Sequence, residues 1–343
     1  MKTTYWLGLL LFFILSCNKE KKWDIPLEKE EIDLQFTNIS QDFFDPKISL
    51  PHLYQNYPFF FDSSVDDAVW EKQRKDSLEL QVFAATLNIF SSDEQKELKK
   101  LFARFHYYFP NELVPNVFLY ASGLQNINEP VLFGSKEGML FIALDGFLGE
   151  REPLYQQTEV YPYQLKFMNP ENIAPAVVQA IGREIIPFNP RQQTFIDLMV
   201  DEGKKMILAD ALLPETSDAL KIGFSPEHLD WAHANEAGIW NYFVEQNILF
   251  DTDRSYRERF LQAAPFSKFL NEIELDSPGR IGVWTGWQIC RKYLKENPEM
   301  SLQEFIHQDT QVIFKEAKYK PKKGDGDYAP LKRAANDEIE KYE

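Results

Sequence analysis

The residues whose spacing could support chemistry lie in two stretches, VVQAIGREIIP at 177–187 and DEGKK, which contains Glu202. In a zinc peptidase, two metal ligands stand at positions i and i+4 of a helix, with a general base at i+1. Gln179, Ala180 and Arg183 occupy those three positions here. Eighteen residues separate Arg183 from Glu202, which matches the spacing of a third ligand. The chain therefore keeps the spacing of a metal site without the usual ligands.

These side chains do not suit zinc-peptidase chemistry. Arg183 is permanently charged and has no lone pair, Gln179 is a poor ligand, and Ala180 cannot act as a base. Glu202 alone would not hold zinc. We therefore expect no metal, no cofactor and no catalytic residue here, and we expect Arg183 to pair with Glu202 where the metal would lie. The alternatives are two unrelated surface residues, or an Arg183 that binds the carboxylate of a ligand.

Two predicted helices position these side chains. Prolines near both ends predict one helix over 175–186. A second helix is predicted to begin near Thr194, with Asp197 completing a weak capping box, and to end before Pro214. Gly203 in the second helix would allow a neighbouring helix to approach closely.

A third glycine-bearing stretch, PGRIGVWTGWQICRKYLKENP at 278–298, also has helical spacing. Gly282 and Gly286 lie one turn apart, with Arg280 and Trp284 around them. A glycine inside a helix costs about 1 kcal/mol relative to alanine, so a contact should require it. Tight helix packing is the favoured interpretation. The alternative is that this face and Arg280 close over the degenerate cleft.

The rest of the pattern predicts a mostly α-helical α+β domain with a small sheet. Ser91 opens a capping box, and helical spacing also covers 65–89 and 228–250. Apolar segments bounded by Gly, Pro and Asn predict strands at 114–123 and 138–149, with a turn at 134–138. From about Pro175 onward, every long element is predicted to be helical.

An acidic loop follows the second predicted strand and carries Asp145, Glu150 and Glu152. These carboxylates could form a pair of the glycosidase kind, but that signal is unspecific, and an acidic loop after a strand is usually a solvated turn. Cys290 lies in an apolar helical pattern and is interpreted as a core residue. Only Cys17 accompanies it, which excludes an intrachain disulfide framework and a cysteine-based metal site.

The N-terminus predicts lipid attachment. A lysine and a short apolar run precede the sequence ILSC, which ends at Cys17 and has the form of a lipobox. The alternatives are an uncleaved anchor or a signal peptide with an incidental cysteine. We predict a signal peptide at 1–16, a tether at 17–31, one globular domain at 32–321 and a charged tail at 322–343. The predicted location is the cell envelope, on the periplasmic or outer-membrane side.

The composition narrows the range of partners. The formal net charge of −16 argues against nucleic acid as a partner and against electrostatic adsorption to anionic lipid. The aromatic content of 15%, with 28 phenylalanines, indicates a filled interior rather than disorder.

Long motifs then resemble the GldB family of gliding-motility lipoproteins over nearly the whole mature chain. They are FIALDGFLGEREPLY, YQLKFMNPENIAPAVVQAIGREIIPF, LMVDEGKKMILADALLP, PGRIGVWTGWQICRKYL and FKEAKYKP, in that order. The family is distantly similar to zinc peptidases that carry H-E-x-x-H on one helix and Glu-Gly on the next. The resemblance places Gln179 and Arg183 at the histidines, Ala180 at the base and Glu202 at the third ligand.

What the resemblance implies is a degenerate zincin-like domain of the gluzincin type. It also implies a membrane-associated protein required for surface gliding, with protein partners in the gliding and secretion machinery. Because three of the four site positions depart from the peptidase pattern, we expect a non-catalytic assembly or accessory component. The alternative is a residual zinc-dependent hydrolase acting on peptides or cell wall.

Overall fold

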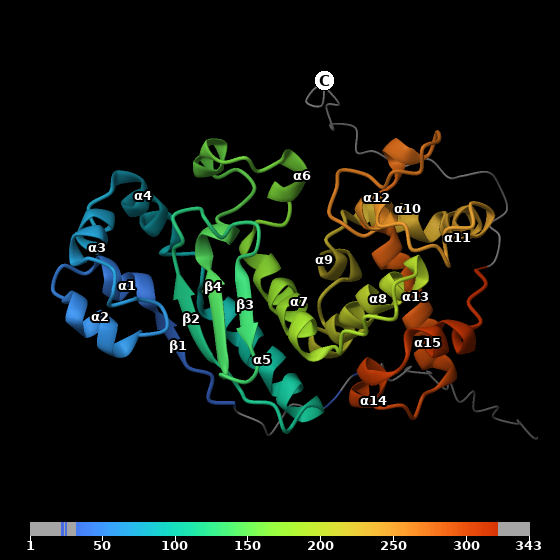
Figure 1. Cartoon of the computed structure of the whole chain (residues 1–343), viewed down its shortest axis with the longest axis horizontal. Coiled ribbons are helices and arrows are strands. Elements are labelled where there is room, and N and C mark those ends of the chain that lie inside the picture. Colours follow the sequence, from blue (N-terminus) through green and yellow to red (C-terminus); the bar gives the residue numbers. More distant parts are fainter. Residues whose placement is uncertain (1–21, 24, 26–31, 322–343) are drawn as a thin grey trace, which may run out of the picture.

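A four-stranded mixed sheet lies within the residues that the computed structural model describes, which are 22, 23, 25 and 32–321 (Figure 1). Its strands are β1 (Phe36–Asn38), β2 (Asn116–Tyr120), β3 (Val131–Gly134) and β4 (Met139–Ala143), in the order β1-β2-β4-β3. β2 runs parallel to both β1 and β4, whereas β3 and β4 form an antiparallel hairpin.

Both faces of the sheet are covered, so its central strands are apolar at successive positions. Val117, Leu119, Leu140 and Ile142 belong to the main hydrophobic core. The alternate residues on the same strands, such as Phe118 and Phe141, contact a second cluster on the opposite face. This arrangement follows from the period of two along a strand.

The predicted strands are confirmed in part. The strand expected at 114–123 contains β2, and the turn expected at 134–138 joins β3 to β4. The strand expected at 138–149 is too long, because the chain leaves the sheet after Ala143 and forms the 3-10 helix η1 (Leu144–Phe147).

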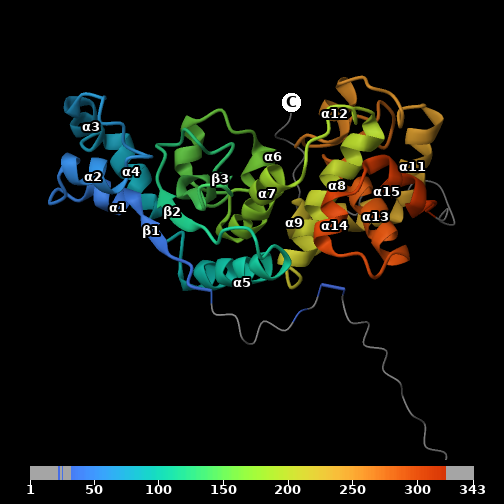
Figure 2. The ribbon, with the colours of Figure 1, turned by 60° about the horizontal axis from the view of Figure 1, so that its bottom comes forward.

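Five helices belong to the N-terminal part of the chain. They are α1 (Ile39–Phe44), α2 (Leu50–Asn56), α3 (Asp67–Gln73), α4 (Ser77–Thr86) and α5 (Ser92–Tyr108). α1 and α2 contribute to the cluster against Phe118 and Phe141, while α5 packs on the other face through ring contacts with Phe133 (Figure 2). The predicted capping box at Ser91 is present at the start of α5.

The helical spacing predicted over 65–89 is confirmed, and two helices, α3 and α4, occupy this stretch. Asp76 stands between them, and its side chain accepts hydrogen bonds from the backbone N–H groups of Leu78 and Glu79. An aspartate in this role starts a new helix rather than continuing the old one.

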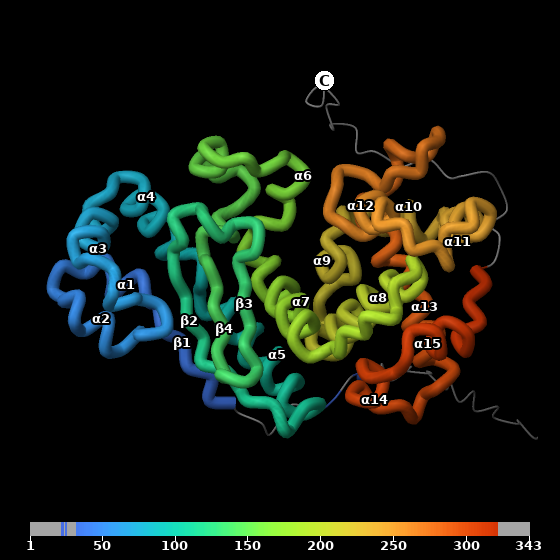
Figure 3. Tube along the Cα trace, in the orientation of Figure 1, coloured from blue at the N-terminus to red at the C-terminus, as the bar shows by residue number. Residues whose placement is uncertain are grey.

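The remaining elements are helical, as the sequence predicts. They are η2 (Pro153–Gln157), α6 (Pro162–Leu165), η3 (Pro170–Asn172), α7 (Ile173–Ile185), α8 (Phe195–Leu212), α9 (Asp218–Ile222), α10 (Pro226–Ala234), α11 (Glu236–Glu245), α12 (Ser255–Phe260), η4 (Glu274–Asp276), α13 (Ile281–Glu296), α14 (Leu302–His307) and α15 (Thr310–Ala317). Figure 3 shows the chain passing from the sheet to the C-terminal helices through α7 and α8. The predicted capping box of Thr194 and Asp197 starts α8.

The helix expected over 228–250 is also divided, into α10 and α11. Asn235 lies at the break, where its buried side-chain amide donates to the carbonyl oxygen of Trp231. This local bond competes with continuation of the helix.

The contact between α8 and α13 depends on two glycines. A Cβ atom on Gly286 would lie 1.8 Å from the carbonyl oxygen of Met199, and one on Gly203 would lie 2.5 Å from the backbone of Gly286. The prediction of tight helix packing at these positions is confirmed. Cys290 is fully buried beside this contact, so its interpretation as a core residue is also confirmed.

The predicted signal peptide and charged tail lie outside the described residues, as does most of the predicted tether. Within the described part of the chain, no helix has the length and apolar character needed to span a membrane.

Candidate functional site

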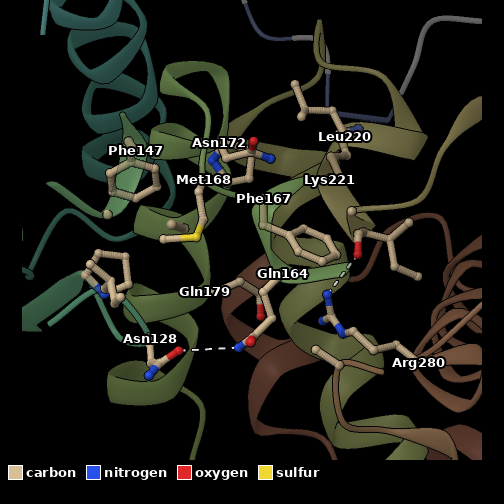
Figure 4. A pocket seen from close by; sticks show the side chains of 18 residues that line it. Asn128, Phe147, Gln164, Phe167, Met168, Asn172, Gln179, Leu220, Lys221 and Arg280 are labelled. Atoms are coloured by element: carbon tan, nitrogen blue, oxygen red, sulfur yellow. Dashed lines mark hydrogen bonds between the residues drawn. The ribbon is translucent and has the colours of Figure 1, made fainter. Parts of the chain in front are cut away.

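A pocket of about 240 Å³ lies where the sheet-bearing part of the molecule meets α7, α9 and the start of α13 (Figure 4). Its walls are largely apolar, with side chains including Ile127, Phe147, Phe167, Met168 and Ile222. Its polar lining includes Gln179 and Arg280 together with Asn128, Gln164 and Asn172. Two residues singled out from the sequence, Gln179 and Arg280, therefore lie in one pocket.

Arg280 is held at the edge of this pocket by its backbone and by one hydrogen bond. Its φ angle is 63°, an uncommon conformation for a residue other than glycine. Its Nη1 donates to the carbonyl oxygen of Ile222 over 2.8 Å. Burial lowers the pKa of the guanidinium from its usual value, and the negative charge of Glu202 opposes that shift.

The predicted ion pair between Arg183 and Glu202 is wrong. Arg183 is exposed and donates from Nη2 to the carbonyl oxygen of Val131 over 3.2 Å. Glu202 pairs instead with Lys205 on its own helix, at 2.7 Å. The preceding Gly182 faces α8, where its Cβ would lie 3.0 Å from Lys205 Cγ. The next residue of α7 is rotated by about 100°, which takes Arg183 away from α8.

The remaining positions of the zinc-site pattern take part in packing. Ala180 is 3% exposed and belongs to the main hydrophobic core. Gln179 Nε2 lies 3.7 Å from the sulfur atom of Met206. Neither contact is a feature that the metal-ligand spacing could predict.

Of the residues singled out in the stretch at 278–298, some pack against other helices and one lines the pocket. Gly282 lies against Phe260 and Leu261, and Gly286 lies against α8. Trp284 is fully buried, with its ring 5.4 Å from that of His233. Only Arg280 of these four singled-out residues lines the pocket, so the glycines support the fold rather than the site.

Asp145 belongs neither to a carboxylate pair of the glycosidase kind nor to a solvated turn. Its side chain is fully buried and accepts hydrogen bonds from the backbone N–H and hydroxyl of Ser122 and from the N–H of Leu124. Glu152 caps η2 by accepting from the N–H of Leu154, and Glu150 is exposed. The acidic loop therefore organises the end of the sheet.

The sequence did not predict the network of charged residues around Asp210. Asp210 accepts from Arg291 at 2.7 and 2.8 Å, from Lys221 at 3.0 Å and from Trp287 Nε1 at 2.9 Å. Asp218 forms a second pair of bonds with Arg291, at 2.6 and 3.0 Å. The only sequence signal for this network was charged residues within apolar helical patterns.

The pKa shifts in this network follow from its pairing. Burial pushes the pKa of Asp218 upward, but its bonds to Arg291 outweigh that effect and hold the pKa below its usual range. Burial likewise lowers the pKa of Arg291, and the bonds to Asp210 and Asp218 raise it overall. Asp218 and Arg291 therefore stay charged at neutral pH.

Among the described residues that line the pocket beside Arg280, none is Asp, Glu, His, Cys, Ser, Thr or Tyr. Its two charged residues are Arg280 and Lys221, and Lys221 is already paired with Asp210 and Asp218. A smaller neighbouring pocket of about 50 Å³ includes Ser225 and His228, but the Ser225 hydroxyl caps α10. Among the described residues, no group of three or more His, Cys, Asp or Glu could hold a metal ion.

The chain folds into a mainly helical domain with a small mixed sheet and a pocket whose lining includes Arg280. The chain belongs to the family described as gliding motility protein GldB, and the match covers residues 20–321. Membership makes it a gliding motility lipoprotein, which implies anchoring to a membrane through lipid. No curated protein and no solved structure matches the chain.

Proposed function

We propose that this chain is a non-catalytic component of the gliding machinery in the cell envelope, anchored through lipid on Cys17. Its domain would serve assembly or accessory contacts with protein partners of the machinery, on a peptidase-like scaffold whose metal site is degenerate. The observation that carries the proposal is the chemistry of the pocket beside Arg280. Among the described residues that line it, the one side chain of a type that serves as nucleophile or general base is Lys221, and its ammonium group is paired with Asp210 and Asp218.

The positions that would serve zinc chemistry support the same proposal, because other contacts occupy them. Ala180 is in the core, Arg183 binds a backbone carbonyl, and Glu202 pairs with Lys205. A zinc peptidase needs three protein ligands and a general base around an open position. Here Glu202 would be the one carboxylate left from that set.

Glu202→Ala tests this proposal against a residual zinc-dependent hydrolase. In a strain lacking the native chain, we expect the variant to restore gliding as well as the wild type does. The purified wild-type protein is expected to contain no stoichiometric zinc by elemental analysis. Cys17→Ser is the matched variant that should lose membrane anchoring and gliding, because one acyl-bearing residue connects the domain to the bilayer.

Two results would overturn the proposal. One is stoichiometric zinc in the wild type that disappears in Glu202→Ala together with gliding. The other is a Cys17→Ser chain that stays in the membrane fraction and supports gliding. Crosslinking of the anchored protein in native membranes should recover a partner from the envelope, and recovery of none would count against an assembly role.

A further inference from the structure

We propose that the pocket beside Arg280 binds a small carboxylate that also carries an amide N–H and an apolar group. This is the chemistry of an N-acylated amino acid or of a peptide C-terminus. The inference goes beyond the proposed function, which assigns the pocket no ligand.

Arg280 supplies the group that recognises an anion. Among the described residues, its guanidinium has one hydrogen-bond partner, the carbonyl oxygen of Ile222. Figure 4 shows the guanidinium group pointing into the pocket. Its remaining N–H groups are therefore available to a carboxylate, which an arginine can bind through two parallel hydrogen bonds.

The balance of charge around the pocket favours an anionic ligand. No carboxylate lines it, and the ammonium group of Lys221 is held by Asp210 at 3.0 Å. Glu202 acts on Arg280 only through its field and is not part of the lining. A ligand carboxylate would thus meet a guanidinium that has no carboxylate partner within the lining, in a partly desolvated site where such pairs are strongest.

Asn172 supplies an independent sign of a ligand. Its side chain is only 6% exposed and lines the pocket, and its Oδ1 has no hydrogen-bond partner. A buried carbonyl oxygen without a donor is unfavourable, and native structures rarely leave one. The Oδ1 atom is buried in the pocket wall, so the Asn172 side chain would turn toward the pocket to accept a ligand N–H. This is why we assign the ligand an amide donor as well as a carboxylate.

The remaining walls set the apolar part and the size of the ligand. Phe147, Phe167 and Met168 provide aromatic and thioether surface. The volume of about 240 Å³ corresponds to roughly eight waters at their share of liquid volume. A single amino acid with a small acyl group fits this space, whereas a folded domain or a long peptide does not.

Calorimetric titration of the full mature chain in detergent with N-acetyl-L-leucine tests the assignment. The neutral amide of the same compound is the matched ligand control, and we expect the acid to bind at least tenfold more tightly. Arg280→Met should weaken binding of the acid at least tenfold, because it keeps the apolar stem and removes the charge. Ala176→Phe should abolish binding by filling the pocket while Arg280 stays in place.

Arg183→Gln is the matched arginine control, since Arg183 lies on the same helix as Gln179 but outside the pocket. Its affinity should equal that of the wild type. Equal binding of acid and amide, or unchanged binding in Arg280→Met, would overturn the carboxylate assignment. Absence of binding to the wild type would overturn it as well, and so would an Ala176→Phe variant that is folded by circular dichroism and still binds.

A separate observation concerns the surface of the domain that Lys22 and Trp23 contact. Lys22 Nζ donates to the carbonyl oxygen of Asn297 over 3.1 Å. The ring of Trp23 packs edge-on against Tyr108 at 5.9 Å, and the Tyr108 hydroxyl donates to the carbonyl oxygen of Trp23. Lys22 and Trp23 therefore contact the C-terminal ends of α13 and α5, respectively.

From these contacts we infer that the surface around Trp23, Tyr107 and Tyr108 faces the bilayer, given the lipid anchor of the proposed function. Lys22 lies five residues after Cys17, so an extended chain spans at most about 18 Å between them. Tyr107 is 54% exposed, and tyrosine and tryptophan favour membrane interfaces. α12 lies on the opposite side of the molecule in both views (Figures 1 and 2).

A fluorophore attached at Tyr107→Cys or at Glu258→Cys in α12 distinguishes the two sides. The full lipidated chain would be placed in phosphatidylethanolamine–phosphatidylglycerol vesicles that carry a quencher on the head groups. We expect at least threefold stronger quenching at position 107 than at 258. Equal quenching, or stronger quenching at 258, would overturn the orientation alone. Mass spectrometry that shows an unmodified Cys17 would overturn both the orientation and the anchor of the proposed function.

Discussion

Replacing Gly286 with alanine is expected to destabilise the protein severely or leave it insoluble. The added methyl group would lie 1.8 Å from the carbonyl oxygen of Met199, and backbone cannot move away as a flexible side chain can. The two helices would have to separate along an interface where the buried Trp287 and Cys290 of α13 bond to Asp210 and Val200 of α8. We expect a loss of at least about 3 kcal/mol in the free energy of unfolding, measured by urea titration.

Gly182→Ala is the control at a second helix contact. Its nearest neighbour is the Cγ atom of Lys205 at 3.0 Å, which belongs to a flexible side chain. Alanine also favours a helix over glycine by about 1 kcal/mol, so this variant should stay within about 1 kcal/mol of the wild type. If both variants lose the same stability, close backbone approach between α8 and α13 is not what requires Gly286.

The elements that the sequence predicts well are those with local signals. The start of α8 at Thr194 and of α5 at Ser91 follow from capping residues that lie within one turn. The breaks within 65–89 and 228–250 were not predicted, because helical spacing continues across each break while a single side chain bonds to the backbone there. Asp76 and Asn235 make those bonds, and their identity alone does not reveal them.

At the candidate site, local sequence signals predict only part of the arrangement. The spacing predicted that Gln179 and Arg183 share one face of a helix. In the structure Gln179 lines the pocket and Arg183 does not. The spacing could not give the rotation of that helix against α8, which depends on Gly182 and Lys205. That rotation sends Arg183 toward Val131 and leaves Glu202 without the predicted partner.

Local sequence patterns do not predict contacts between residues that are far apart in the chain. Asp210 and Arg291 are 81 residues apart in the chain, yet they share two hydrogen bonds. Asn172 and Arg280 meet in one pocket although they belong to different helical segments. A sequence gives such residues as isolated charges or amides, and only tertiary packing shows which of them are partners.

Replacing Asp210 with alanine is expected to cost about 3–5 kcal/mol in the free energy of unfolding. The aspartate is 9% exposed and accepts from Arg291, Lys221 and Trp287. Its loss would leave the buried Lys221 and the half-buried Arg291 facing Asp218 alone, and a buried indole N–H without an acceptor. Breaking one member of such a network costs more than the network contributes, because the remaining charges stay desolvated.

Lys96→Ala provides the matched comparison for Asp210→Ala. Lys96 pairs with Asp93 at 3.2 Å, but both side chains are largely exposed, so solvent screens the pair. Its removal should change stability by less than about 0.5 kcal/mol. Urea titration at neutral pH measures both variants against the wild type. A loss below about 1 kcal/mol in Asp210→Ala would show that water reaches the network and that its burial contributes little to the cost.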